Sequence, residues 1–205
     1  MYIPDKYKNT NLLEVQDFIK SNSFGILTSL MKGRLWATHI PLELETKEDR
    51  TKVLVGHIAR ANPQWKYFSD IKEVLCIFNG PHSYISSSWY KEEEVPTWNY
   101  IAVHIYGSLR IQKEKELISS LHKLVEKHEE NSKKPFSLKD VSPGTMRQIK
   151  GVVGFEITIN EIKATYKLSQ GRKEDHEVII SELNKSEDDG SKKIAKEMAK
   201  RSSDK

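Results

Sequence analysis

Some stretches of this chain alternate apolar and polar residues with a period of two, and others are short continuous apolar runs; both patterns predict β-strands. The predicted strands cover residues 24–30, 35–45, 52–58, 73–79, 96–111, 152–161 and 164–169. Lys32-Gly33 and the charged cluster at 46–50 separate neighbouring strands, as hairpin turns do. Pro41 indicates an edge or a bulge within the second strand, and Gly80-Pro81 is expected to break the chain after the fourth.

Other segments repeat their apolar residues every three or four positions and predict helices at 11–20, 63–68 and 114–130. In the first, Asn11 is the expected N-cap. Six or more strands with short hairpins and peripheral helices indicate a mainly β (α+β) fold, an antiparallel β-barrel with helices packed outside.

The composition changes near the C-terminus. Residues 1–185 are predicted to form one domain, whereas Ser186–Lys205 is almost entirely polar or charged. Such a segment buries too little apolar surface to offset its ordering entropy. We therefore expect a mobile tail or a marginal helix there.

The bulk composition favours a cytoplasmic protein. No apolar run reaches the ~20 residues of a membrane helix, the N-terminus lacks a signal pattern, and Cys76 has no second cysteine to pair with. The net charge is +4, but the segment 171–205 holds nine basic and nine acidic residues. There is no arginine-rich arm and no zinc-finger spacing, so the charge is compatible with nucleic acid without arguing for it.

Several kinds of catalytic or metal site have no support in the sequence. The seven histidines show no metal-binding spacing, and no nucleophile elbow, P-loop or dinucleotide glycine motif occurs. No metal site and no catalytic residue is predicted.

The most informative segment is Gly56–Trp65, Gly-His-Ile-Ala-Arg-Ala-Asn-Pro-Gln-Trp, which follows a buried strand. Asn62-Pro63 is a helix start signal, and a helix N-terminus attracts anions. Arg60 could grip two phosphate oxygens, with His57 and Asn62 as further donors. The segment therefore indicates either a seat for a cofactor phosphate or an ordinary strand–helix junction with a solvated arginine.

Polar residues with aromatic neighbours recur elsewhere in the chain. They are His39, Trp89-Tyr90, Trp98-Asn99, and Gln170 with Arg172. Aromatic faces can cover a flat ring while amides fix its edges. A tryptophan in such a place is still more often part of the core.

A series of motifs resembles the PaiB family, described as FMN-binding negative transcriptional regulators. The series comprises Met1-Tyr-Ile-Pro, Phe24-Gly, Ala37-Thr-His-Ile-Pro-Leu, Gly56–Trp65, Gly80-Pro-His-Ser-Tyr-Ile-Ser, Trp89-Tyr, Val95-Pro-Thr-Trp-Asn-Tyr, Lys150-Gly-Val-Val-Gly-Phe-Glu and Lys167-Leu-Ser-Gln-Gly-Arg. The resemblance covers roughly residues 1–180. Ser87 stands where proline is expected and Gly171 where asparagine is expected.

The resemblance implies an FMN-binding split barrel that works as a homodimer with FMN at the subunit interface, and that represses sporulation and degradative-enzyme genes. The implied cofactor-binding residues are Thr38, His39, His57, Arg60, Asn62, Trp98, Asn99, Gln170 and Arg172. Three classes of function stay open: a regulator that senses through its flavin, a flavin-dependent oxidoreductase, and a dimeric module with an empty cleft. No recognition helix with a basic face is visible, so direct contact with DNA has the least support.

Overall fold

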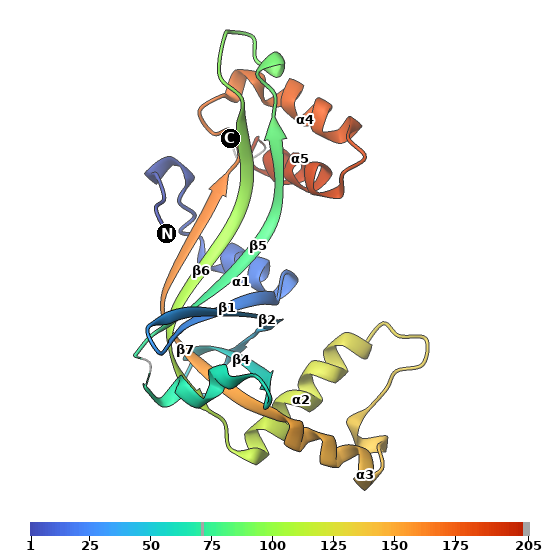
Figure 1. Cartoon of the computed structure of the whole chain (residues 1–205). Coiled ribbons are helices and arrows are strands. Elements are labelled where there is room, and N and C mark those ends of the chain that lie inside the picture. The colour runs from blue at the N-terminus through green and yellow to red at the C-terminus, as the bar shows by residue number, and fades with distance from the viewer. Residues whose placement is uncertain (71, 203–205) are drawn as a thin grey trace. The chain divides into compact units, whose positions relative to one another are not determined.

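The computed structural model describes residues 1–70 and 72–202 (Figure 1). Seven strands form one antiparallel sheet in the order β2-β1-β5-β6-β7-β4-β3. They are β1 (Phe24–Met31), β2 (Arg34–Pro41), β3 (Glu43–Thr46), β4 (Lys52–Ala59), β5 (Val74–Ile85), β6 (Thr97–Ile111) and β7 (Val152–Lys167). The predicted antiparallel split-barrel class is confirmed, although the sheet does not close on itself.

The helices lie between and after these strands. The α-helices are α1 (Leu12–Ser21), α2 (Glu114–Glu129), α3 (Pro143–Met146), α4 (His176–Lys185) and α5 (Asp189–Ser202). Short 3-10 helices are η1 (Asp5–Tyr7), η2 (Pro63–Asp70), η3 (Ser87–Trp89), η4 (Leu138–Asp140), η5 (Arg147–Gly151) and η6 (Lys173–Asp175). Within the described residues, every helix is too short or too polar to cross a membrane.

The two edge strands of the sheet, β2 and β3, follow one another directly in the chain, and the strand partner changes at Leu42 between them. β2 pairs with β1, from Phe24 opposite Pro41 to Met31 opposite Arg34, whereas β3 pairs with β4. Leu42 itself is fully buried, and its backbone N–H donates to the carbonyl of Ser23 at 2.8 Å. The predicted single strand at 35–45 is thus two strands with different neighbours, and Pro41 marks the end of the first.

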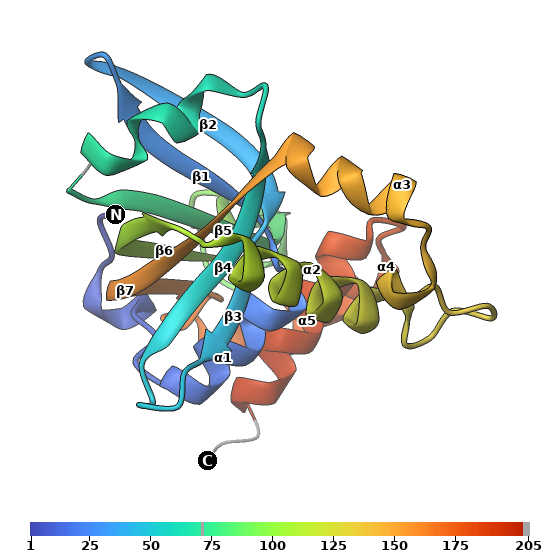
Figure 2. The ribbon, with the colours of Figure 1, turned by 90° about the horizontal axis from the view of Figure 1, so that it is seen from below.

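The chain divides into two compact units, and the first combines Ile19–Ile77 with Ile105–Ile162. Its core includes Leu54, Phe68 and Phe155, all at most 1% exposed. The rings of Phe68 and Phe155 meet edge to face with centroids 5.6 Å apart. Here α2 lies across the β3–β4 hairpin (Figure 2).

The second unit combines Met1–Phe18, Phe78–His104 and the chain from Lys163 onward. The predicted break at Gly80-Pro81 is wrong, because β5 runs through both residues. A side chain at Gly80 would collide with the ring of Phe18, 2.6 Å from an added Cβ. The predicted strands at 152–161 and 164–169 are likewise one long strand, β7.

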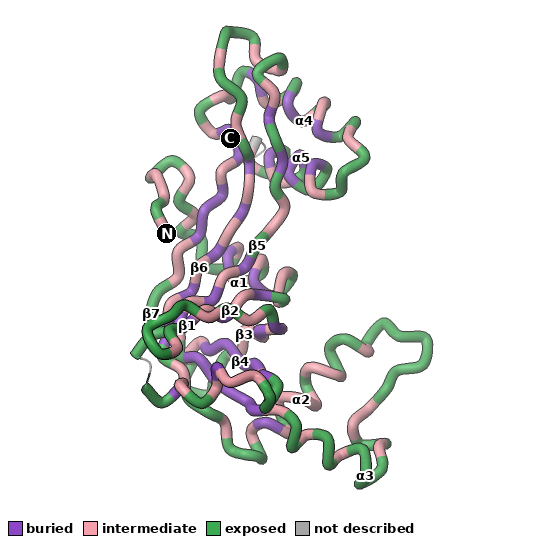
Figure 3. Tube along the Cα trace, in the orientation of Figure 1, coloured by how far each residue is buried: buried purple, intermediate pink, exposed green. Residues whose placement is uncertain are grey.

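Of the two expectations for the segment after residue 185, a mobile tail or a marginal helix, the structure shows a helix, because residues 189–202 form α5. Ile194, Ala195 and Met198 from α5 are at most 1% exposed and complete the core of the second unit. The hydroxyls of Ser191 and Ser83 meet at 2.9 Å in the interior. The inner side of α5 is buried and its outer side exposed (Figure 3).

Candidate functional site

The segment Gly56–Trp65 forms the predicted junction between a strand and a helix. β4 ends at Ala59, and the 3-10 helix η2 begins at Pro63. The side-chain oxygen of Asn62 accepts a hydrogen bond from the backbone N–H of Gln64 at 3.0 Å, which is the expected capping contact. The helix is of the 3-10 type and not an α-helix.

Arg60 is exposed, but its side chain is fixed in place. Nε donates to the carbonyl of Lys150 at 2.7 Å and Nη2 to that of Val152 at 3.2 Å. The guanidinium lies over the ring of Trp65, 5.6 Å from its centroid, and the indole N–H donates to the carbonyl of Arg60 at 2.9 Å. Nη1 makes no hydrogen bond to any described residue, so a rigidly held cation faces solvent.

Arg60 borders a hollow of about 340 Å³ that Trp65, Ile149 and Lys150 also line. Gly154 forms part of its wall, where a Cβ would come within 2.8 Å of the side chain of Leu117. The hollow therefore combines two cationic side chains with one acidic side chain, Glu114, and mostly apolar walls. That combination suits the phosphate end of an amphipathic ligand.

Thr38 and Asn62, both half-buried, meet in a polar network around the buried side chain of Gln64. Asn62 Nδ2 donates to Thr38 Oγ1 at 2.9 Å, and that hydroxyl donates to Gln64 Oε1 at 2.6 Å. The amide nitrogen of Gln64 donates to the hydroxyl of Ser29 at 2.9 Å and the carbonyl of Leu27 at 3.4 Å. These bonds occupy the donors and acceptors that Thr38 and Asn62 would offer a ligand.

Gln64 is the residue of this network that the sequence analysis missed. It is 0% exposed although it is a polar residue near the start of a helix. The sequence feature that could have pointed to Gln64 is its position in the Asn-Pro-Gln-Trp motif. The structure assigns it to joining η2 with β1 and β2.

Thr38 and His39 are neighbours on β2, so their side chains point to opposite faces of the sheet. Thr38 faces the Gln64 network, whereas His39 is exposed and stacks with Phe24, the ring centroids being 6.4 Å apart. The two predicted site residues therefore do not line one surface together.

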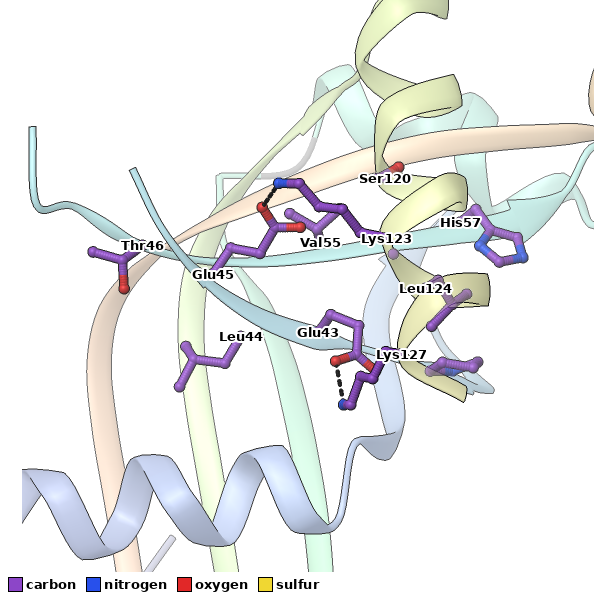
Figure 4. Close-up of a pocket in the computed structure, with 12 residues that line it drawn as sticks. Glu43, Leu44, Glu45, Thr46, Val55, His57, Ser120, Lys123, Leu124 and Lys127 are labelled. Carbon is purple, nitrogen blue, oxygen red and sulfur yellow. Dashed lines mark hydrogen bonds and ion pairs between the residues drawn. The ribbon is translucent and has the colours of Figure 1, made fainter. Parts of the chain in front are cut away.

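His57 lines a different hollow, of about 260 Å³, between the β3–β4 hairpin and α2 (Figure 4). Two ion pairs cross this hollow, Lys123 with Glu45 and Lys127 with Glu43, each at 2.6 Å. Burial lowers the pKa of His57, so its imidazole is neutral near pH 7. The lysines are already paired, and this hollow does not offer free positive charge to a phosphate.

Trp98 and Asn99 also differ in their surroundings. Trp98 is 51% exposed and lies 5.5 Å from the ring of His82 and 6.2 Å from that of Tyr84. Asn99 is fully buried, and its amide donates to the hydroxyl of Ser169 at 2.9 Å. Trp98 is thus available to a flat ring, whereas Asn99 joins β6 to the loop after β7.

Gln170 and Arg172 are held by local contacts. Gln170 accepts a hydrogen bond from the backbone N–H of Leu168 at 2.9 Å and donates to the carbonyl of Tyr166. Arg172 pairs with Glu94 and lies over the ring of Tyr90, 5.4 Å from its centroid. Both side chains shape the loop after β7.

The two departures from the family motifs have a simple structural setting. A Cβ at Gly171 would meet nothing within 4 Å, so the expected asparagine would fit there. Ser87 is exposed and begins η3, where proline would also be accommodated.

Comparison with known proteins decides the family. Residues 1–161 match the family model described as "Putative FMN-binding domain". The Protease synthase and sporulation protein PAI 2 of Bacillus subtilis is 42% identical over 200 residues, which are 97% of this chain and 96% of that protein. The chain belongs to the PaiB family of FMN-binding domains.

Solved structures agree with the split-barrel fold of this family. The Azotobacter vinelandii flavocytochrome Anf3 superposes with a TM-score of 0.61 at 13% identity, covering 78% of this chain and 69% of that chain. The FAD and heme binding protein of Mycobacterium smegmatis gives 0.60 at 11% identity, covering 78% and 73%. At such low identity these likenesses establish the fold alone.

Proposed function

We propose that this PaiB-family protein is an FMN-dependent negative transcriptional regulator that acts as a homodimer. The observation that carries the proposal is the 42% identity to the PAI 2 protein of Bacillus subtilis over 97% of the chain. That match is too long to stop at the family domain, which ends at residue 161, so it extends into α4 and α5. By this proposal the chain represses sporulation and degradative-enzyme genes.

Arg60 is our candidate for the residue that holds the FMN phosphate. Its guanidinium is already oriented by the carbonyls of Lys150 and Val152, so little side-chain entropy is lost when an anion binds. Lys150 would add a second positive charge at the same hollow. Bound FMN would supply a ring that can accept and return electrons.

Other site residues take narrower roles in this proposal. Thr38 and Asn62 position the segment that carries Arg60, since their polar atoms bond to one another and to Gln64. Trp98 belongs to the second unit, and its exposed face suits contact with a flat ring there. We assign no direct ligand contact to Asn99.

The homodimer has a candidate surface on the outer face of the β1–β2 hairpin. Leu30 and Leu35 lie directly opposite each other there, and they are 54% and 70% exposed. Phe24 lies on the same face and is 67% exposed, beside His39. β2 is also an edge strand. An exposed apolar face at a sheet edge favours contact with a second copy.

The test uses complementation and flavin binding together. In a Bacillus subtilis strain that lacks its PAI 2 protein, the chain should restore repression of an extracellular-protease reporter. Arg60→Ala should bind FMN one to two decades more weakly, because a charge-assisted contact contributes roughly 1.5–3 kcal/mol, and should restore repression poorly. Arg34→Ala, which removes another exposed arginine, is the matched control. Normal FMN binding without repression would refute the regulator, and flavin reduction by a nicotinamide donor would then favour the oxidoreductase.

A further inference from the structure

The outer face of α5 carries a compact group of lysines. Lys192, Lys193, Lys196 and Lys200 are all exposed. At 3.6 residues per turn they fall within an arc of about 100° and span about 12 Å along the helix axis. We call these four residues the α5 lysine face.

This face lies on the side of α5 opposite its buried residues. Ser191, Ile194, Ala195 and Met198 point into the core of their unit, and the helical period places them roughly 160° from the lysines. Burial of the apolar side fixes the orientation of the helix. The lysines are therefore presented to solvent by a rigid element.

Most of the positive charge on this face is uncompensated. Lys192, Lys193 and Lys196 form no ion pair with a described residue, while Lys200 pairs with Glu197 at 2.6 Å. From residue 190 to residue 202 there are five basic residues and one acidic residue. From 173 to 189 there are two basic and seven acidic residues. The segment 171–205 is therefore neutral in sum, but most of its acidic residues precede α5 and most of its basic residues lie on α5.

We propose that the α5 lysine face binds the phosphate backbone of DNA, an inference that rests on the proposed regulatory function. Duplex DNA carries one negative charge per ~1.7 Å of its axis, so a 12 Å row of lysines would face several phosphates. Lysines contact phosphates without reading base sequence, so this face would position the protein and not select the site.

The same helix fits a membrane surface poorly. An interfacial helix needs an apolar face to insert between lipids, and in α5 that face is occupied by the protein core. The α5 lysine face can therefore bind a partner only through its charge. A rigid row of lysines suits a polyanion with regularly spaced charges better than it suits a lipid surface.

The test measures binding of the full chain to a fluorescent DNA duplex of mixed sequence over a range of salt concentrations. The variant Lys192→Gln/Lys193→Gln/Lys196→Gln should bind more weakly, and the slope of log K against log salt should become shallower by roughly 2–3 for each subunit in contact. The matched control Lys115→Gln/Lys133→Gln/Lys134→Gln removes the same charge from exposed lysines elsewhere and should leave the slope close to that of the unmodified protein.

Three results would overturn the proposal. The first is an equal slope of log K against log salt for the two variants. The second is no DNA binding by the unmodified protein. The third is an α5 lysine variant that no longer binds anionic phosphatidylserine vesicles but still binds DNA as the unmodified protein does. The reporter assay judges the regulatory function separately. Repression by the unmodified chain together with any of these three results would leave that function standing while this surface fails.

Discussion

The guanidinium of Arg201 lies 2.5 Å from a carboxylate oxygen of Glu14, which joins the last helix of the chain to the first. The same guanidinium lies over the ring of Tyr166, 4.8 Å from its centroid. Both charged side chains are about a quarter to a third exposed, so the ion pair itself stabilises the fold by little. Its presence shows that α5 is a docked element of the second unit.

Truncating the core of α5 should therefore destabilise the protein. Met198 is 0% exposed, and Met198→Ala should lower the free energy of unfolding by about 2–5 kcal/mol because a cavity remains. Lys196→Ala, on the outer side of the same helix, should change it by no more than about 0.5 kcal/mol. Urea unfolding followed by circular dichroism measures both, and equal stability of the two variants would contradict the packing of α5.

The carboxylate of Glu156 is the next test of the structure, because it is buried with two cationic partners. Lys47 lies 2.7 Å away and Arg110 3.0 Å away, while the Glu156 side chain is only 7% exposed. Glu156→Gln should cost about 1.5–3 kcal/mol, because a buried carboxylate loses its charge-assisted hydrogen bonds, while Lys47 and Arg110 are partly exposed and Arg110 keeps Glu116. Glu126→Gln, at an exposed pair with Lys139, should cost less than about 1 kcal/mol in the same denaturant titration.

Stability should also fall in acid through Glu116. Hydrogen bonds from the Arg110 side chain and the Lys113 backbone N–H lower the pKa of Glu116 from 4.5 to about 2. The folded pKa lies below the unfolded one, so this stabilisation is complete above pH 4.5 and is lost as the pH falls towards 2. Glu116→Gln should flatten the dependence of unfolding free energy on pH in this window. An unchanged acid profile in that variant would contradict the assignment.

The Gln64 network separates a structural role from a binding role. Gln64→Leu should destabilise the protein by roughly 1–3 kcal/mol, because it leaves the buried hydroxyl of Ser29 without its Gln64 partner and removes one hydrogen bond from the half-buried Thr38. The variant protein that remains folded should bind FMN with an affinity near that of the unmodified chain. Isothermal titration calorimetry below the unfolding transition checks this. A loss of affinity as large as that of Arg60→Ala would instead place the network at the ligand.

The outer face of the β1–β2 hairpin predicts the oligomeric state. Leu35→Glu places a charge in the exposed apolar surface and should shift the protein from dimer to monomer in analytical ultracentrifugation. Val178→Glu, at an exposed apolar position on α4, is the control and should leave the mass unchanged. A dimer that survives Leu35→Glu would require another interface.

Part of this fold could be predicted from the sequence because local patterns agree with it. The strands expected at 24–30 and 52–58, the Lys32-Gly33 turn and the Asn62 cap each match the structure. The turn residues have φ of +53° and +76°, which a two-residue hairpin of the observed kind requires.

The misses arise where distant segments decide the outcome. The segment 186–205 is polar in its average composition. An average takes no account of spacing, and here the few apolar residues fall on one side of a helix, namely Ile194, Ala195 and Met198. The strand partners on either side of Leu42 depend on residues far along the chain. Donor groups at Thr38, Asn62 and Asn99 looked available in the sequence, but the folded chain uses them itself.

The change of strand partner at Leu42 also limits how the length of this chain can vary during evolution. One inserted residue between Pro41 and Glu43 would turn the side chains of one flanking hairpin to the wrong face of the sheet, because their period is two. The turn at Lys32-Gly33 and the loop at 47–51 are exposed and can absorb extra residues. Insertions and deletions among relatives should therefore gather in those two loops and avoid the junction at Leu42.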